Sequence, residues 1–223
     1  MTFDISLIVE RGGPVRLVII ALSMIALAVT IYKLLQFVLL RVGSHATARK
    51  AVQLWLDGQH QAAYANVVKH PAPLSRVLAH AMRGLSHGAG QLENVREDVG
   101  RVASEELREL RKYLRVIELI AQVAPLLGLL GTVVGMIQAF ADLQQSGAVV
   151  NPATLAGGIW TALLTTAMGL TVAIVFSTIS SWFDARIEAE RSMMETTLTG
   201  FLAHRITEAQ VRSAGEARAL RDA

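Results

Sequence analysis

Three long stretches of the chain are almost free of charged residues, whereas charged residues crowd the segments between and after them. The stretches are Leu17 to Tyr32, Leu119 to Phe140 and Leu155 to Phe183. Each can be extended to the roughly 20 residues that a helix needs to cross the hydrocarbon core of a bilayer. The pattern predicts an all-α membrane protein with three transmembrane helices, of which the second and third extend into a helical cytoplasmic region.

The first of these stretches is the least apolar. Arg16 stands at its start, and Lys33 and Gln36 lie near its end. Long basic side chains near the ends of a transmembrane helix can reach the lipid headgroups, so we expect Arg16 and Lys33 to do so.

The pattern divides the chain into seven segments. They are a periplasmic or interfacial N-terminus (1–14), transmembrane helix 1 (15–40), a cytoplasmic helical region (41–117), transmembrane helix 2 (118–140), a periplasmic loop (141–153), transmembrane helix 3 (154–183) and a cytoplasmic C-terminal helix and tail (184–223). No helix-breaking residue separates the charged helix that begins at Leu92 from Ile117, so we expect it to continue without interruption into the second transmembrane helix. Turn signals in the periplasmic loop are Gly147 and Asn151–Pro152. We expect the C-terminal helix to end near Ala209 and the last dozen residues to be disordered.

The distribution of basic residues predicts the orientation. The loop between the second and third transmembrane helices contains no lysine or arginine, whereas the segments after the first and third helices contain many. By the positive-inside rule, the N-terminus lies outside and the C-terminus lies in the cytoplasm.

Composition excludes several classes of function. The net charge of +3 comes from arginines dispersed among acids, without the interleaved aromatic residues of a nucleic-acid-binding surface. The chain has no cysteine, which excludes disulfides and thiolate metal sites. It has no HExxH motif, phosphate-binding loop or GxSxG motif, and its six histidines all lie in segments predicted to be outside the membrane. We therefore expect no enzyme, no cofactor and no metal site.

The second transmembrane helix contains residues that are poor helix formers in water. They are Pro125, Gly128, Gly131 and Gly135, and each glycine would weaken a helix in water by about 1 kcal/mol. In a bilayer the helix forms anyway, because unpaired backbone groups are too costly there. Small residues let neighbouring helices approach closely, so we expect a packing surface with the Thr132 hydroxyl beside it.

The third transmembrane helix carries a stripe of small and hydroxyl-bearing residues, with Thr161 and Thr165 on its flank. The stripe consists of Gly158, Ala162, Thr166, Gly169, Ala173 and Ser177. One interpretation is that helices pack along the stripe and each threonine bonds back to the backbone. The other is that stripes from several subunits line a polar path, with Thr132 at a matching depth. Neither helix has a carboxylate, lysine or histidine in its core, so the titrating group of a proton path would have to come from another chain.

Two motifs together closely resemble the signatures of the MotA/TolQ/ExbB proton channel family. They are Ala124 to Phe140 (APLLGLLGTVVGMIQAF) and Gly157 to Ile174 (GGIWTALLTTAMGLTVAI). The three-helix layout is more similar to the ExbB/TolQ branch, because MotA-like stators are longer and have four transmembrane helices. The two motifs together are specific, and the three-helix layout covers nearly the whole chain.

The resemblance implies a pentamer in the bacterial inner membrane around a dimer of single-span helices of the ExbD/TolR type. The partner would supply the aspartate that takes up the proton, and ion flow would drive work on a periplasmic protein of the TonB or TolA type. Thr132 and Thr166 match the two pore-facing threonines of the family, and Pro125 would kink the second helix at the cytoplasmic mouth.

One position departs from the family pattern. ExbB and TolQ typically carry a glutamate where this chain has Thr161, and a threonine cannot titrate. Either the partner's aspartate suffices, or rings of Thr132, Thr161 and Thr166 hydroxyls bind a desolvated sodium ion. A non-conducting scaffold of the same fold is the other alternative; a small transporter is disfavoured because no discontinuous helix pair or intramembrane charge marks a substrate site. The expected ion-pathway residues are Thr132, Thr166, Thr161 and Thr165, and the expected packing or kink residues are Pro125, Gly128, Gly131, Gly135, Gly158 and Gly169.

Overall fold

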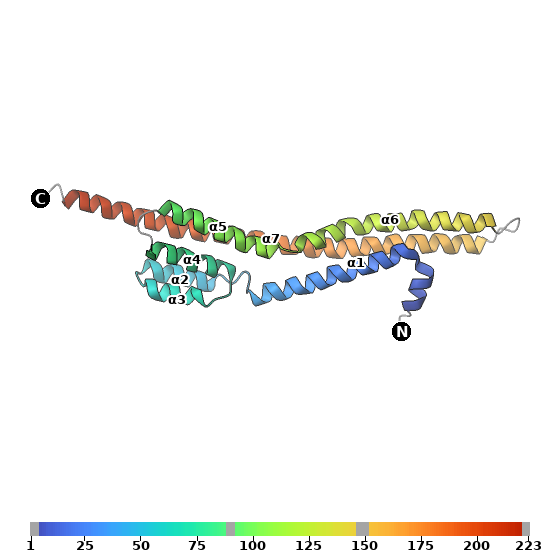
Figure 1. Cartoon of the computed structure of the whole chain (residues 1–223), viewed down its shortest axis with the longest axis horizontal. Helices are drawn as coiled ribbons and strands as arrows, with labels where there is room; N and C mark the ends of the chain where they lie inside the picture. The colour runs from blue at the N-terminus through green and yellow to red at the C-terminus, as the bar shows by residue number, and fades with distance from the viewer. Residues whose placement is uncertain (1–4, 88–91, 146–151, 220–223) are drawn as a thin grey trace. The chain divides into compact units, whose positions relative to one another are not determined.

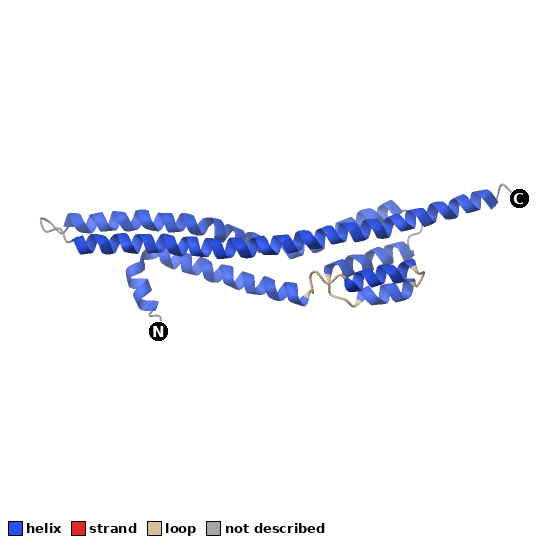
Figure 2. Ribbon diagram, turned by 180° about the vertical axis from the view of Figure 1, so that it is seen from behind, coloured by secondary structure: helices blue, strands red, loops and turns tan. Residues whose placement is uncertain are grey.

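The structure, a computed structural model, describes the backbone of residues 5–87, 92–145 and 152–219, and the side chains of residues 13–86, 93–144, 153 and 155–203. The backbone of these residues forms seven helices and no strand (Figure 2). The helices, labelled in Figure 1, are α1 (Ile5–Leu39), α2 (Ala46–Leu56), α3 (His60–Val68), α4 (Pro73–His87), α5 (Leu92–Arg111), α6 (Leu114–Gln145) and α7 (Pro152–Ala219).

Three of these helices are long and apolar enough to cross a membrane. The candidate spans are Gly13–Leu39 in α1, Leu114–Gln144 in α6 and Leu155–Ala203 in α7. Large apolar side chains such as Leu126, Ile137 and Ile174 are exposed on these helices, where lipid would cover them. The expectation of an all-α protein with three membrane-spanning helices, the last two of them long, is confirmed.

The chain divides into two compact units. The transmembrane unit comprises Met1–Leu34 and Tyr113–Phe183, and the helical unit comprises Leu35–Lys112 and Asp184–Ala223. Helix α7 contributes its first half to the transmembrane unit and its second half to the helical unit.

In the transmembrane unit, α6 and α7 run side by side and approach each other at small residues (Figure 1). A Cβ atom added at Gly169 would lie 2.5 Å from the carbonyl oxygen of Ala124, and one added at Gly128 would lie 3.0 Å from the Cα atom of Thr166. Cβ atoms added at Gly135 and Gly158 would lie 2.8 Å and 2.7 Å from the methyl groups of Ala162 and Ala139. The two backbones are therefore close enough that these positions leave no room for a side chain.

Helix α1 changes direction at Gly13, which has φ 62° and ψ 168°. Glycine adopts this conformation without the steric cost that a side chain would add, and Pro14, which follows, has no N–H group to continue the ladder of helical hydrogen bonds. The second part of α1 then packs in the transmembrane unit, with Ile19 and Ala26 buried.

The helical unit has its own hydrophobic core. Helices α2, α3 and α4 enclose it with residues such as Trp55, Val67 and Leu78, and α7 contributes Met194 and Phe201. The rings of Trp55 and Phe201 meet edge to face with centroids 5.6 Å apart. This core holds the extension of α7 against α2 to α5, so the end of the third membrane helix is part of a folded unit.

A buried glutamate of α7 holds the turn that precedes α2. The backbone N–H of Gly43, at φ 90°, donates to Glu190 Oε2 over 3.0 Å, and His45 Nε2 lies 2.9 Å from the same oxygen. Because a buried carboxylate is stable only with such partners, Glu190 fixes this turn to α7.

The expectation of one uninterrupted helix from Leu92 through the second span is wrong. Helix α5 ends at Arg111 and α6 begins at Leu114, and Tyr113 between them has a left-handed φ of 67°. No glycine or proline marks this break. The Tyr113 ring meets the Tyr32 ring of α1 edge to face, with centroids 5.9 Å apart, and such a contact offsets part of the backbone strain.

The expected end of the C-terminal helix near Ala209 is also wrong, because α7 continues to Ala219. The turn signals Gly147 and Asn151 lie outside the described residues, as do residues 220–223.

Two glycines of α7 test the close packing of α6 and α7. We expect Gly169→Ala to lower the free energy of unfolding by about 1–3 kcal/mol, because the added methyl group meets the rigid backbone of α6. Gly157→Ala is the matched control, because nothing lies within 4 Å of its added methyl group, and alanine favours a helix by about 1 kcal/mol. Thermal unfolding of both variants in detergent measures the difference; equal stability of the two would contradict the packing described.

Candidate functional site

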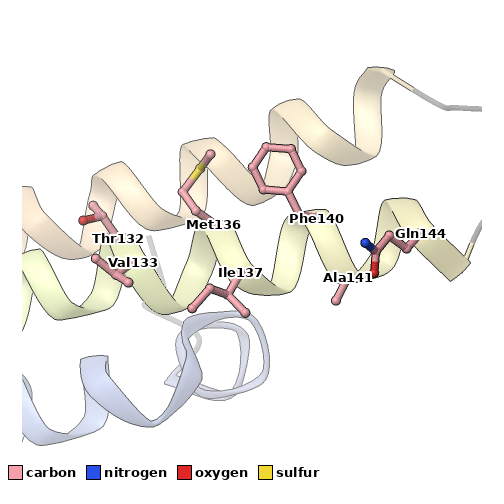
Figure 3. A pocket seen from close by; sticks show the side chains of 7 residues that line it. All are labelled: Thr132, Val133, Met136, Ile137, Phe140, Ala141 and Gln144. Atoms are coloured by element: carbon pink, nitrogen blue, oxygen red, sulfur yellow. The ribbon is translucent and has the colours of Figure 1, made fainter.

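Thr132 lies in a shallow hollow on the surface of α6 (Figure 3). The hollow has a volume of about 590 Å³ and is lined by Thr132, Val133, Met136, Ile137, Phe140, Ala141 and Gln144. All seven side chains come from α6, and only Thr132 and Gln144 are polar. The Thr132 hydroxyl donates to the carbonyl oxygen of Leu129 over 2.6 Å, and its oxygen keeps lone pairs to accept from outside the chain.

Thr166 of α7 lies at the contact between α7 and α6. Its hydroxyl donates to the carbonyl oxygen of Gly128 over 2.7 Å, and it thereby joins α7 to α6. This hydrogen bond is possible because Gly128 has no side chain to hold the helices apart. The Thr166 hydroxyl is therefore bonded to α6 of the same chain.

Thr161 and Thr165 are engaged by α1 and by their own helix. The Thr161 hydroxyl donates to the Gly157 carbonyl over 2.8 Å, and the buried Thr165 hydroxyl donates to the Thr161 carbonyl over 3.0 Å. From α1, Arg16 Nε donates to Thr165 Oγ1 over 2.8 Å, and Arg16 Nη2 donates to the Thr161 carbonyl. Thr161, the position at which the resemblance implies a glutamate, thus has a guanidinium group at its backbone carbonyl.

The residues that were expected to pack or kink the helices lie on α6 and α7. Gly131 lies against the methyl group of Thr165, and Val15 of α1 lies on the same side of Gly131. Gly128, Gly135, Gly158 and Gly169 lie at the contacts of α6 and α7 given above. Pro125 lies inside α6, and the helix continues on both sides of it.

The site has oxygen atoms but no titrating group from α6 or α7. From 119 to 141 and from 155 to 183 the sequence contains no ionisable side chain. The described residues also contain no cluster of three or more histidine, aspartate or glutamate side chains that could hold a metal ion. Hydroxyl and carbonyl oxygens can accept hydrogen bonds or ligate a cation, but they cannot take up and release a proton near neutral pH.

The contact of Arg16 with α7 was not expected from the sequence. Arg16 and Lys33 were both expected to reach the headgroups, but Arg16 is only 5% exposed and Lys33 is 0% exposed. The hydrogen-bond partners of Arg16 are 149 and 145 residues away in the chain. The available signal was the ionisable residue inside an apolar stretch, which usually has a specific partner.

The chain is similar in sequence to a known protein family. Residues 69–196, more than half of the chain, match the MotA/TolQ/ExbB proton channel family. A protein of Methanothermobacter thermautotrophicus named as a biopolymer transport protein ExbB homolog is 28% identical over 123 residues. That match covers 55% of this chain and 42% of the length of that protein. The family match covers α6 and the first part of α7, and it confirms the resemblance carried by the two motifs.

The hydrogen bond from Thr166 to Gly128 predicts a measurable stability difference. We expect Thr166→Val to lower the free energy of unfolding by about 1 kcal/mol, because the side chain keeps its volume and loses the interhelical bond. Thr171→Val is the matched control, since the exposed Thr171 hydroxyl bonds only to Ala167 of its own helix, and its loss should change stability by less than about 0.5 kcal/mol. Chemical unfolding in mixed micelles compares them, and an equal effect of both substitutions would contradict the interhelical role.

Proposed function

The chain belongs to the MotA/TolQ/ExbB proton channel family, and on that premise we propose that it is the multi-pass subunit of an ion-motive-force-driven motor of the ExbB/TolQ type. Five copies surround a dimer of single-span helices of the ExbD/TolR type in the bacterial inner membrane. Proton flow through this complex does work on a periplasmic protein of the TonB or TolA type, in outer-membrane transport or envelope maintenance.

The proposal rests on one combined observation: the surface of α6 presents a threonine hydroxyl, whereas the apolar segments of α6 and α7 contain no acidic side chain. Thr132 lies in an otherwise mostly apolar hollow on the surface of α6, and no ionisable residue occurs from 119 to 141 or from 155 to 183. A hollow lined by five apolar side chains and two polar ones, Thr132 and Gln144, is suited to the side of another apolar helix. The helix that covers it then supplies the carboxylate that binds the proton.

The proposed topology follows from the charge distribution. With the N-terminus in the periplasm, the helical unit lies in the cytoplasm together with most of the lysines and arginines. The helical unit then gives each subunit a folded cytoplasmic part, joined to the pore through α7. The chemistry assigned to the complex is ion conduction, with no enzymatic reaction.

A second candidate function is a non-conducting scaffold of the same fold that anchors a periplasmic protein. The hydrogen bonds favour it, because the hydroxyls of Thr132, Thr161 and Thr166 all donate to backbone carbonyls of the same chain. Under this alternative the threonines only stabilise the helices. A sodium-driven motor is a variant of the first proposal, in which the same oxygens ligate the ion.

Substitution of Thr132 distinguishes the motor from the scaffold. We expect Thr132→Val to reduce proton flux through the reconstituted complex by about tenfold or more, the cost of one lost hydrogen bond to a charged species in the rate-determining step. Thr171→Val is the control, because it removes a hydroxyl of the same kind from an exposed position in the same membrane region. Flux is measured with a pH-sensitive dye in proteoliposomes under an imposed potential.

Two outcomes would contradict the proposal. Flux through Thr132→Val equal to that of the unchanged complex would place Thr132 outside the ion path. A complex that assembles with its partner and conducts neither protons nor sodium would favour the scaffold.

A further inference from the structure

Arg16 is a buried cation inside a membrane-spanning helix. It lies in the span Gly13–Leu39 of α1, and the residue is 5% exposed. Charged side chains inside a membrane are costly and persist where they have a specific partner or a function. An arginine side chain stays protonated in proteins, so its positive charge is permanent.

The guanidinium group occupies two oxygen atoms of α7. Its Nε donates to Thr165 Oγ1 over 2.8 Å and its Nη2 donates to the carbonyl of Thr161. The Thr161 carbonyl also accepts from the Thr165 hydroxyl over 3.0 Å. The Thr161 carbonyl oxygen therefore already accepts from two side-chain donors of the same chain, and the Thr165 hydroxyl oxygen already accepts from one.

The partners of Arg16 on α7 are neutral. They are a hydroxyl and a carbonyl, and neither α6 from 119 to 141 nor α7 from 155 to 183 carries an acidic residue. The charge is consequently not cancelled by these helices, and its field acts on anything that enters at the level of Thr161 and Thr165. In a poorly hydrated region, charges interact much more strongly than in water.

We propose that Arg16 is a specificity-determining residue, which excludes sodium and other desolvated metal cations from the oxygens of Thr161 and Thr165. A hard cation in a protein is held by several oxygen ligands, and here the guanidinium group already binds the Thr161 carbonyl oxygen and the Thr165 hydroxyl oxygen. Its positive charge also repels a cation at hydrogen-bond distance from the same oxygens. A proton carried on a partner's carboxylate does not need these oxygens as ligands, so Arg16 does not block its passage by occupying them.

This inference rests on the proposed function, since ion specificity matters only in a conducting complex. It removes Thr161 from the hydroxyl rings that a sodium-driven motor would use, and it leaves Thr132 and Thr166.

The test measures sodium binding to the purified chain, without any partner. The unfolding temperature of the full chain in an uncharged detergent is compared in sodium chloride and in choline chloride at equal ionic strength. We expect no difference between the salts for the unchanged chain or for Arg16→Lys, which keeps the charge. Arg16→Gln and Arg16→Met remove the charge and free the oxygens; they should gain about 3 °C at a sodium concentration tenfold above the dissociation constant. Arg49→Gln, at an exposed position of α2, is the control and should behave like the unchanged chain.

Three results would overturn the inference. The first is a sodium-specific stabilisation of the unchanged chain that Thr165→Val abolishes. The second is folded neutral variants that respond to the two salts as the unchanged chain does. The third is loss of the folded protein in both neutral variants while Arg16→Lys folds, which would make Arg16 a purely structural contact. Failure of the motor proposal is seen separately, as absent ion flux in the reconstituted complex, and does not alter this comparison.

Discussion

The close approach of the α6 and α7 backbones is the constraint on which the rest of the transmembrane unit depends. A Cβ atom at Gly169 would collide with the Ala124 carbonyl, and one at Gly128 would press on the backbone of Thr166. Lipid offers no hydrophobic driving force between helices, so van der Waals packing and interhelical hydrogen bonds hold them together. Small residues provide both, because they bring backbone atoms into contact and bring side-chain hydroxyls within reach of carbonyl groups.

The close packing of α6 and α7 determines which hydrogen bonds the threonines form. With the backbones in contact, the Thr166 hydroxyl reaches the Gly128 carbonyl. The space left by Gly131 takes the methyl group of Thr165, whose hydroxyl oxygen accepts the bond from Arg16. Thr132 differs, because it lies in a hollow on the surface of α6. The inter-helical threonines therefore stabilise the subunit, and Thr132 is the one of the four candidate ion-pathway threonines that lies in this surface hollow.

The sequence predicted the parts of the structure that local composition controls. The three apolar stretches predicted the membrane helices, and the glycines at 128, 131 and 135 indicated a close-packed face, because both features depend on hydropathy and side-chain size. The break at Tyr113 could not be predicted, since tyrosine rarely adopts a left-handed conformation and the aromatic contact that accompanies it lies on a distant helix. The hydrogen bond from Arg16 to Thr165 could not be predicted for a similar reason, because it joins residues 149 positions apart in the chain. The ion-pathway role of Thr132, Thr161, Thr165 and Thr166 remains a prediction, because it depends on chains other than this one.

The central claim is that this chain forms the wall of an ion path and that another chain carries the titrating acid. The most direct measurement is proton flux into liposomes that contain the purified chain alone, under an imposed membrane potential, with a pH-sensitive dye inside. The account predicts flux no greater than that of empty liposomes, because neither α6 nor α7 has an ionisable group in its apolar segment. Addition of the single-span partner should then produce flux. Proton flux through the chain alone, at the rate of the complete complex, would contradict the account.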